Sequence, residues 1–219
     1  MLVSHRHQFI FVKTLKTGGT SVEGYFERWC MPEGAWVPSH TREMHISEAG
    51  IVGERAGSRP NPPEWWNHMP AEMIRDRVGP QTWESYFKFS VVRNPYDQMV
   101  SLFYFKNREL AGSTFDGSHP AAFMEWLRTV EAPNSASLCS VDGRLALDFL
   151  IRYERLHDDL QTVCARVGVP WDRQWLPEYK RGLRPPQAQV AAMYGPEARA
   201  IADRLLAEEL DRLGYTFPG

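Results

Sequence analysis

With 219 residues the chain is long enough for one sizeable hydrophobic core or two small ones. Its 43% hydrophobic and 24% charged residues are typical of a globular protein and exclude a disordered chain. The 25 Lys and Arg residues nearly balance the 27 Asp and Glu residues, and the formal charge is −2. This balance gives no overall electrostatic reason to bind nucleic acid or an anionic membrane, although a local basic site for a small anion is still allowed.

The cysteines and the apolar runs indicate the cellular compartment in which the protein resides. Cys30, Cys139 and Cys164 lie far apart without C-x-x-C spacing, so we expect three buried or half-buried thiols in a reducing environment. The N-terminal apolar run is too short for a secretory signal, and no stretch approaches the ~20 apolar residues that cross a bilayer. The sequence therefore predicts a cytoplasmic protein with one domain over residues 1–219.

The first predicted elements are a strand, a glycine turn and a helix. The apolar run at residues 8–12 (QFIFV) predicts a buried strand. Thr20 and Glu23 fit a capping box, which starts the helix at Thr20 or Ser21. Four large apolar residues share one face of this helix: Val22, Tyr25, Phe26 and Trp29.

A long segment without periodicity follows. Proline and glycine interrupt residues 31–64, which predicts mostly loop with room for one short helix. A loop of this length is often a lid or a substrate wall. Residues 70–78 then predict a short helix with proline in its first turn and Gly79 after its end.

The second strong strand is residues 87–92 (FKFSVV), which lead into a helix that Asn94 caps and Pro95 begins. The inward residues of this helix are Tyr96, Met99, Val100 and Phe103. Later elements are a strand at 145–151 and helices at 121–130, 156–167 and 196–213. Strands that alternate with helices predict an α/β layer fold with a mainly parallel sheet, whose ligands bind at the carboxyl ends of the strands.

Residues 16–21 (KTGGTS) form the first candidate anion turn. Gly18 and Gly19 let the backbone approach a phosphate, the helix start offers N–H groups, and Lys16 adds a positive charge. In a Walker A loop the lysine follows the glycines, whereas here it precedes them, so the standard nucleoside-triphosphate loop is absent. The alternative is a plain strand-to-helix turn with a solvated lysine.

Arg93 and Ser101 form the second candidate anion turn. Arg93 ends a strand, and a serine on the same side of the next helix completes a plausible phosphate clamp. The alternative is a helix cap with surface salt bridges. Two anion turns on neighbouring strands indicate a ligand with two separate phosphate groups.

Together these motifs give the chain a family likeness. It resembles the sulfotransferases, in particular compact bacterial members related to carbohydrate sulfotransferases. FVKTLKTGGTSVE resembles their 5′-phosphosulfate loop, FSVVRNPYDQMVSLFYF their 3′-phosphate segment, and NHMPAEMIRDRVG the segment with their catalytic histidine. RYERL and LDRLGYTF also match. Leu15 departs from the proline that relatives often have before the lysine, and this change affects only the shape of the turn.

The resemblance implies a fold and a reaction. The fold is a three-layer α/β/α sandwich with a mainly parallel sheet, similar to that of P-loop NTPases. The donor is 3′-phosphoadenosine-5′-phosphosulfate (PAPS), and the sulfuryl group passes to a hydroxyl or amine without a metal. Lys16 would contact the bridging oxygen and the 5′-phosphate. The rest of the loop would hold the 5′-phosphate: Thr17, Gly18, Gly19, Thr20 and Ser21.

The acceptor must lose a proton, and a histidine is the natural base near neutral pH. Among seven histidines the candidates are His40, His45 and His68. His68 is preferred because it precedes the short helix at the family's histidine position; the alternative is a helix-start histidine bonded to backbone. His119 precedes a proline in a polar segment and is expected at the surface.

Other residues are assigned through the same resemblance. Arg93 and Ser101 would bind the 3′-phosphate, and Tyr153 would lie near the nucleotide, unless it is a core tyrosine at a strand end. A late basic loop would close over the 3′-phosphate, unless its charges are simply solvated: Lys180, Arg181 and Arg184.

The acceptor is expected to be a carbohydrate or another hydroxylated small molecule. Trp65 and Trp66 would stack on it, unless they pack in a core-edge turn, and His40 with residues 31–64 would form its wall. The rival functions are a P-loop-type small-molecule kinase, which needs Mg²⁺ and a carboxylate to hold it, and a nucleotide-binding protein without catalysis.

Overall fold

The computed structural model describes residues 1–55, 63–110, 112–179 and 182–218. The chain divides into two compact units. Unit 1 consists of Met1–Val92 and Ser135–Tyr179, and unit 2 of Arg93–Asn134 and Lys180–Gly219. The single domain expected from the sequence stays a prediction. Among the described residues, no helix combines the length and the apolarity that crossing a bilayer requires.

Unit 1 contains a six-stranded sheet in the order β3-β4-β1-β2-β5-β8. The strands are β1 (Leu2–Ser4), β2 (Phe9–Val12), β3 (His45–Ser47), β4 (Gly50–Val52), β5 (Phe87–Val92) and β8 (Phe149–Arg152). β2, β5 and β8 pair in parallel, with Phe9 opposite Phe87 and Phe89 opposite Phe149. The other pairs, β1 with β2, β1 with β4 and β3 with β4, are antiparallel. The sheet is therefore mixed, and the expectation of a mainly parallel sheet holds for β2, β5 and β8 alone.

The two strongest strand predictions are confirmed as β2 and β5, because both are apolar runs buried in the middle of the sheet. Strand β1 and the β3–β4 hairpin were not predicted, and the hairpin lies within residues 31–64, where the sequence indicated loop. Each of these strands has only three residues, too few for a period to be detected. The predicted strand at 145–151 contains instead the end of β7 (Arg144–Leu145), which pairs with β6 (Ser140–Val141), and the start of β8.

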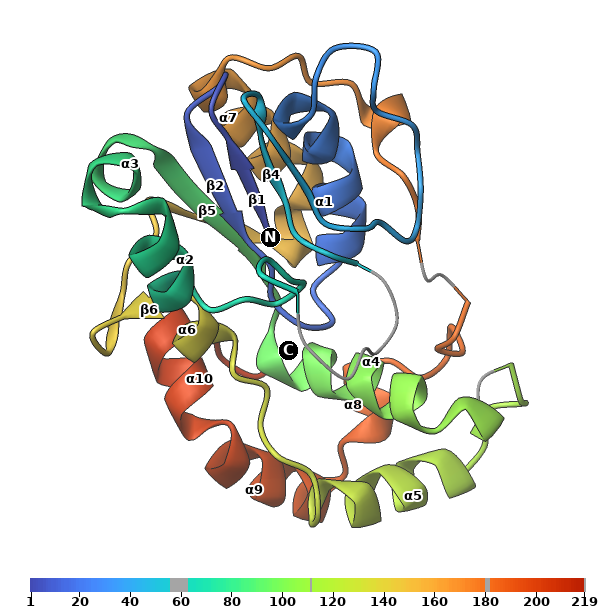
Figure 1. Ribbon diagram of the computed structural model, residues 1–219. Coiled ribbons are helices and arrows are strands. Elements are labelled where there is room, and N and C mark those ends of the chain that lie inside the picture. Colours follow the sequence, from blue (N-terminus) through green and yellow to red (C-terminus); the bar gives the residue numbers. More distant parts are fainter. Residues whose placement is uncertain (56–62, 111, 180–181, 219) are drawn as a thin grey trace. The chain divides into compact units, whose positions relative to one another are not determined.

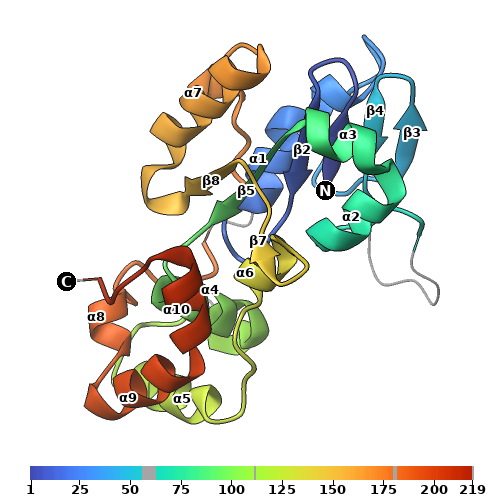
Figure 2. The same ribbon diagram turned by 90° about the vertical axis from the view of Figure 1, so that its left-hand side faces the viewer.

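Helices cover both faces of the sheet in unit 1 (Figures 1 and 2). On one face, Phe9, Phe11 and Phe89 share a core with α1 (Gly19–Phe26), the 3₁₀ turn η1 (Glu27–Cys30) and α7 (Leu156–Val167). On the other face, Ile10 and Val12 pack with α2 (Ala71–Val78) and α3 (Pro80–Ser85). The predicted helices at 70–78 and 156–167 are thus confirmed. The likeness of this arrangement to P-loop NTPases stays a prediction.

The remaining short elements of unit 1 are α6 (Ser135–Leu138) and the 3₁₀ turns η3 (Tyr153–Arg155) and η4 (Arg173–Trp175). The three thiols, Cys30, Cys139 and Cys164, are all in unit 1, buried and free, as expected.

Unit 2 is helical in its described part. Its elements are α4 (Pro95–Lys106), η2 (Arg108–Leu110), α5 (Ser118–Leu127), α8 (Val190–Met193), α9 (Pro196–Leu205) and α10 (Ala207–Leu213). The four inward residues predicted for α4 are all buried in the core of this unit. The prediction of a single helix over 196–213 is wrong in one respect, because the helix breaks at Leu206. The ψ of Leu206 is 3°, which leaves the helical range, and its side chain is fully buried.

Candidate functional site

In unit 1 the anion loop, residues 16–21, connects the end of β2 to α1. Gly18 has a φ of 77°, in the left-handed region that glycine tolerates, and its carbonyl accepts a hydrogen bond from Ser21 N at 3.0 Å. Helix α1 starts one residue earlier than predicted, at Gly19. Among the described residues no side chain caps this start, so the predicted capping box of Thr20 and Glu23 is wrong. The Glu23 carboxylate lies in the core instead, where Lys13 Nζ contacts it.

Both glycines are required by close contacts. A Cβ atom on Gly18 would lie 3.0 Å from the ring of Tyr153, which follows β8. A Cβ atom on Gly19 would lie 3.1 Å from Cγ of Lys13. Real Cβ atoms are seldom this close to their neighbours, so a larger residue at either position would require the Tyr153 ring or the Lys13 stem to move by a few tenths of an ångström. The structure therefore brings Tyr153 against the anion loop, and its contact with a nucleotide stays a prediction.

The hydroxyl groups of the loop differ in their surroundings. Thr17 is fully buried, and its Oγ1 lies 2.8 Å from Oγ1 of Thr14, which also donates to the carbonyl of Val91 on β5. Ser21 Oγ accepts a hydrogen bond from Tyr179 N at 3.3 Å. The Thr17 hydroxyl is therefore engaged with Thr14, which in turn ties this part of the chain to the sheet.

His68 lies just before α2, and its ring contacts the backbone of Lys13, the residue that follows β2. Its Nδ1 is 3.1 Å from the backbone carbonyl oxygen of Lys13. Because a carbonyl only accepts, Nδ1 carries the proton and Nε2 keeps its lone pair. Burial, aided by the charge of Lys13, lowers the pKa of His68 to about 3, so the ring is neutral at pH 7.

The backbone is strained at the two proposed catalytic residues. Lys16 has a φ of 56° and His68 a φ of 61°. Among the described residues, only Gln8 and Asp142 share this left-handed conformation without being glycine. Such conformations cost about 1 kcal/mol or more each and cluster at functional sites. The strain therefore supports a functional role for both residues.

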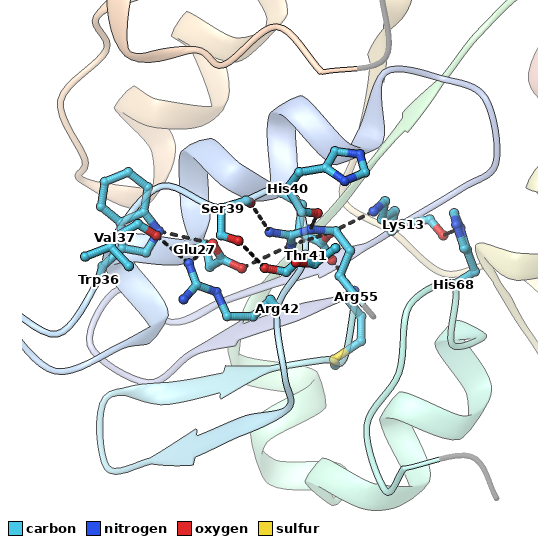
Figure 3. A network of polar contacts seen from close by, with 12 residues as sticks. Lys13, Glu27, Trp36, Val37, Ser39, His40, Thr41, Arg42, Arg55 and His68 are labelled. Carbon is cyan, nitrogen blue, oxygen red and sulfur yellow. Dashed lines mark hydrogen bonds and ion pairs between the residues drawn. The ribbon is translucent and has the colours of Figure 1, made fainter. Parts of the chain in front are cut away.

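A charge cluster surrounds the side chains of Glu23 and Glu27, and Figure 3 shows most of its members. We define it as Lys13, Glu23, Glu27, Arg42 and Arg55. The Glu23 carboxylate contacts Lys13 Nζ and Arg55 Nη1, each at 2.8 Å, and also the amino group of Met1 at 2.7 Å. Burial alone would raise the pKa of Glu23, but these cations outweigh it and hold the pKa well below its usual value.

The cluster also fixes the backbone at Ser39 and His40 through hydrogen bonds. Glu27 contacts Arg55 and Arg42, each at 3.0 Å. Arg55 in turn donates from Nε to the carbonyl of His40 and from Nη2 to that of Ser39, both at 2.9 Å. The sequence does not predict this cluster, because its partners are distant along the chain. The one local signal, Glu23 near a helix start, is typical of a capping box instead.

The proposed acceptor residues occupy different environments. His40 is exposed, and its ring lies edge-on to that of Tyr179 at 5.3 Å between centroids. Trp65 is only 4% exposed and packs in the core beside α2, which matches the core-edge alternative. Trp66 is half-buried, and the guanidinium of Arg77 lies 5.2 Å from its ring. His45 is part of strand β3.

In unit 2 the carboxylate of Asp97, in the first turn of α4, pairs with two arginines. Asn94 caps the helix as predicted, accepting a hydrogen bond from Tyr96 N. Arg93 contacts Asp97 Oδ2 at 2.6 Å, and Arg184 Nη1 donates to Asp97 Oδ1 at 2.5 Å. Burial alone would raise the pKa of Asp97, but the two guanidinium groups outweigh it and lower the pKa.

Ser101 lies further along α4 and is half-buried. The Arg184 side chain is held a second time, because its Nε donates to the carbonyl of Ala188 at 2.6 Å. Lys180 and Arg181 lie outside the described residues. The structure therefore brings Arg93 and Arg184 together through Asp97, a residue that the sequence analysis did not assign to the site.

Comparison with known proteins identifies a family. Residues 1–186 match the profile of a family described as the sulfotransferase family. An uncharacterized protein from Archaeoglobus fulgidus is 30% identical over 107 residues, which are 47% of this chain and 84% of that protein. The family match spans β1 to β8 and α1 to α7, and it includes both anion turns and His68.

Proposed function

We propose that this chain, which belongs to the sulfotransferase family, transfers a sulfuryl group from PAPS to a hydroxyl or amine of a carbohydrate or other small-molecule acceptor. The product nucleotide would be 3′-phosphoadenosine-5′-phosphate (PAP). The observation that carries the proposal is the 3.1 Å contact between His68 Nδ1 and the Lys13 carbonyl. It ties a neutral imidazole to the strand end from which the anion loop begins.

Unit 1 would bind the 5′ end of the donor. The uncapped N–H groups at the start of α1, with Gly18 and Gly19, suit a phosphate oxygen. Lys16 would contact the bridging oxygen between sulfur and phosphorus, where negative charge develops as that bond breaks. Thr17, Thr20 and Ser21 would complete the cradle.

His68 would act as the base. The acceptor oxygen or nitrogen attacks sulfur in line with the bridging oxygen, and its proton passes to Nε2 of His68. As the new bond to sulfur forms, the old S–O bond breaks and its electron pair leaves with PAP. The low pKa of His68 belongs to the protein without donor. The anionic groups of a bound donor raise it, because they favour the imidazolium form.

Unit 2 would bind the 3′-phosphate through side chains. Arg93 and Ser101 are the proposed ligands, joined by Arg184 from the late basic loop. A guanidinium can bind a phosphate in two-pronged fashion, which suits recognition of this group. Tyr153 would contact the nucleotide, and His40 and Trp66 would contact the acceptor. No metal ion takes part in the reaction as proposed.

Thermal shift with three ligands tests the donor class. We expect PAP to raise the melting temperature, 5′-AMP to raise it less, and ATP with Mg²⁺ to have the smallest effect. Stabilisation by ATP with Mg²⁺ alone would contradict the proposal and favour a kinase. Turnover is then tested with labelled PAPS and a panel of sugars, phenols and amines, with the product identified by the mass of one added sulfuryl group.

A matched pair of variants separates an enzyme from a binding protein. Lys16→Met and His68→Gln should each abolish most of the turnover on any acceptor found, whereas only the first should also weaken PAP binding. If PAP binds and none of the acceptors is sulfated, while both variants bind PAP like the wild type, the chain is a nucleotide-binding protein without this chemistry.

A further inference from the structure

Lys13 is a charged residue buried at the point where β2 ends. Its side chain is only 2% exposed. The Nζ atom contacts Glu23 Oε2 at 2.8 Å, and the stem packs beneath Gly19 at the start of α1. Its backbone carbonyl accepts the hydrogen bond from His68 Nδ1. One residue therefore contacts both the helix start and the histidine, as Figure 3 shows for Lys13 and His68.

Stability alone is a poor explanation for this lysine. Removing an ammonium group from water is costly, and a buried ion pair often contributes no more than well-packed apolar residues would. Nor does Glu23 depend on Lys13 for compensation, because Arg55 Nη1 contacts the same carboxylate oxygen at 2.8 Å. A positional role accounts better for the burial of this charge.

We propose that Lys13 is a positioning residue for His68. Its ion pair with Glu23 ties the end of β2 to α1 and so holds the Lys13 carbonyl where it keeps the His68 proton on Nδ1. Nε2 is then the nitrogen that accepts a proton. The inference rests on the proposed function only in treating His68 as the base; the geometry of His68 itself is testable without turnover.

The charges around His68 give the proposal a measurable consequence. Lys13 and the amino group of Met1 act to lower the pKa of His68, whereas Glu23 acts to raise it. Replacing Lys13 with methionine keeps the unbranched stem that packs under Gly19 but removes the charge and the tether. Because Arg55 still compensates Glu23, we expect the variant to fold.

The experiment is nitrogen NMR of the full chain labelled with ¹⁵N-histidine, with the His68 signals assigned through His68→Gln. In the wild type we expect the Nδ1–H tautomer and a ring that stays neutral well below the usual pKa near 6.5. In Lys13→Met the ring should titrate about one pH unit or more higher and show a mixture of tautomers. Lys88→Met is the matched control, since Lys88 is also buried and paired, with Asp148 at 3.0 Å, and should leave the His68 signals unchanged.

The activity measurement adds a second readout. We expect Lys13→Met to lower kcat about tenfold with little change in donor KM, as displacement of a base does. Lys13→Arg keeps the charge and should restore most of kcat. A wild-type His68 with its proton on Nε2, or a Lys13→Met spectrum identical to that of the wild type, would overturn the proposal. A mixture of tautomers in Lys13→Met, in a protein that sulfates nothing, would retain the proposal and reject the proposed function.

Discussion

Helices α1 and α4 both follow a parallel strand, yet their first turns differ in construction. The start of α1 has a left-handed Gly18, no acidic residue in its first turn and, in the described part of the chain, no capping side chain. The start of α4 has an Asn94 cap on Tyr96 N and an acidic Asp97 in the first turn. Among the described residues, one helix start therefore has no side-chain cap, and the other is capped by an asparagine and carries a carboxylate.

This difference indicates two ways to bind a phosphate. At α1 the backbone N–H groups and the helix dipole are available, so binding depends on glycines that permit close approach. At α4 the cap and the carboxylate already satisfy the dipole, so an anion there must be held by side chains such as Arg93 and Arg184. We expect the 5′ end of the donor to respond to backbone changes as well as to loss of Lys16, and the 3′ end to loss of arginine.

The largest effect is expected at Lys16, the one full charge within the anion loop. Lys16→Met should lower kcat/KM for PAPS about 10³-fold, because the leaving oxygen loses its positive partner. Steady-state kinetics with varied donor measure this. Lys106→Met, which changes an exposed lysine in the last turn of α4, is the control and should behave like the wild type. Equal losses in both variants would contradict a specific role for Lys16 at the leaving oxygen.

His68→Ala should lower kcat about 10²-fold or more with little change in donor affinity, the scale of a lost general base. His40→Ala and His45→Ala are the comparison variants, and a fully active His68→Ala enzyme would transfer the role to one of them. The base acts in its neutral form, so activity declines only as pH falls through the pKa. With that pKa at about 3 in the free protein, kcat/KM should stay level as pH falls from about 8 to about 6.

Much of the fold was predictable where the signals are local. The apolar runs of β2 and β5, the amphipathic α7 and the Asn94–Pro95 helix start are each encoded within a few neighbouring residues. The position of His68 just before α2 was also predictable from its motif, whereas its role as the base stays a prediction. These features need no knowledge of distant parts of the chain.

The remaining features depend on contacts between distant residues. Glu23 pairs with Lys13 ten positions away and with Arg55 at a separation of 32, so a local interpretation mistook it for a cap. The three-residue strand β1 is a strand because β2 and β4 flank it. His119, expected at the surface, is 2% exposed and bonded to the hydroxyl of Tyr104 within unit 2. The local sequence pattern around Glu23, β1 and His119 does not reveal the distant residues that contact them.

Arg93→Ala tests whether side chains at the start of α4 bind the 3′-phosphate. We expect donor KM to rise about tenfold or more, because a charge-assisted bond to the 3′-phosphate is lost, while kcat changes less. Binding of PAP should weaken more than binding of 5′-AMP in isothermal titration calorimetry. Arg108→Ala, an exposed arginine in η2, is the control. Equal weakening of both nucleotides would contradict the assignment of Arg93 to the 3′ end.

The smallest effect is expected from a change to the backbone at the start of α1. Two glycines with the same conformation test it. Gly18 and Gly143 both have a φ of 77°, but a Cβ atom would meet the Tyr153 ring only at Gly18, with no described atom within 4 Å at Gly143. Alanine at either position should cost about 1 kcal/mol of unfolding free energy, measured in urea, because that conformation disfavours a side chain. Only Gly18→Ala should also weaken PAP binding several-fold, and adding Tyr153→Ala should restore part of it by relieving the contact. Unchanged PAP affinity in Gly18→Ala would mean that the start of α1 does not need close backbone approach to hold the anion.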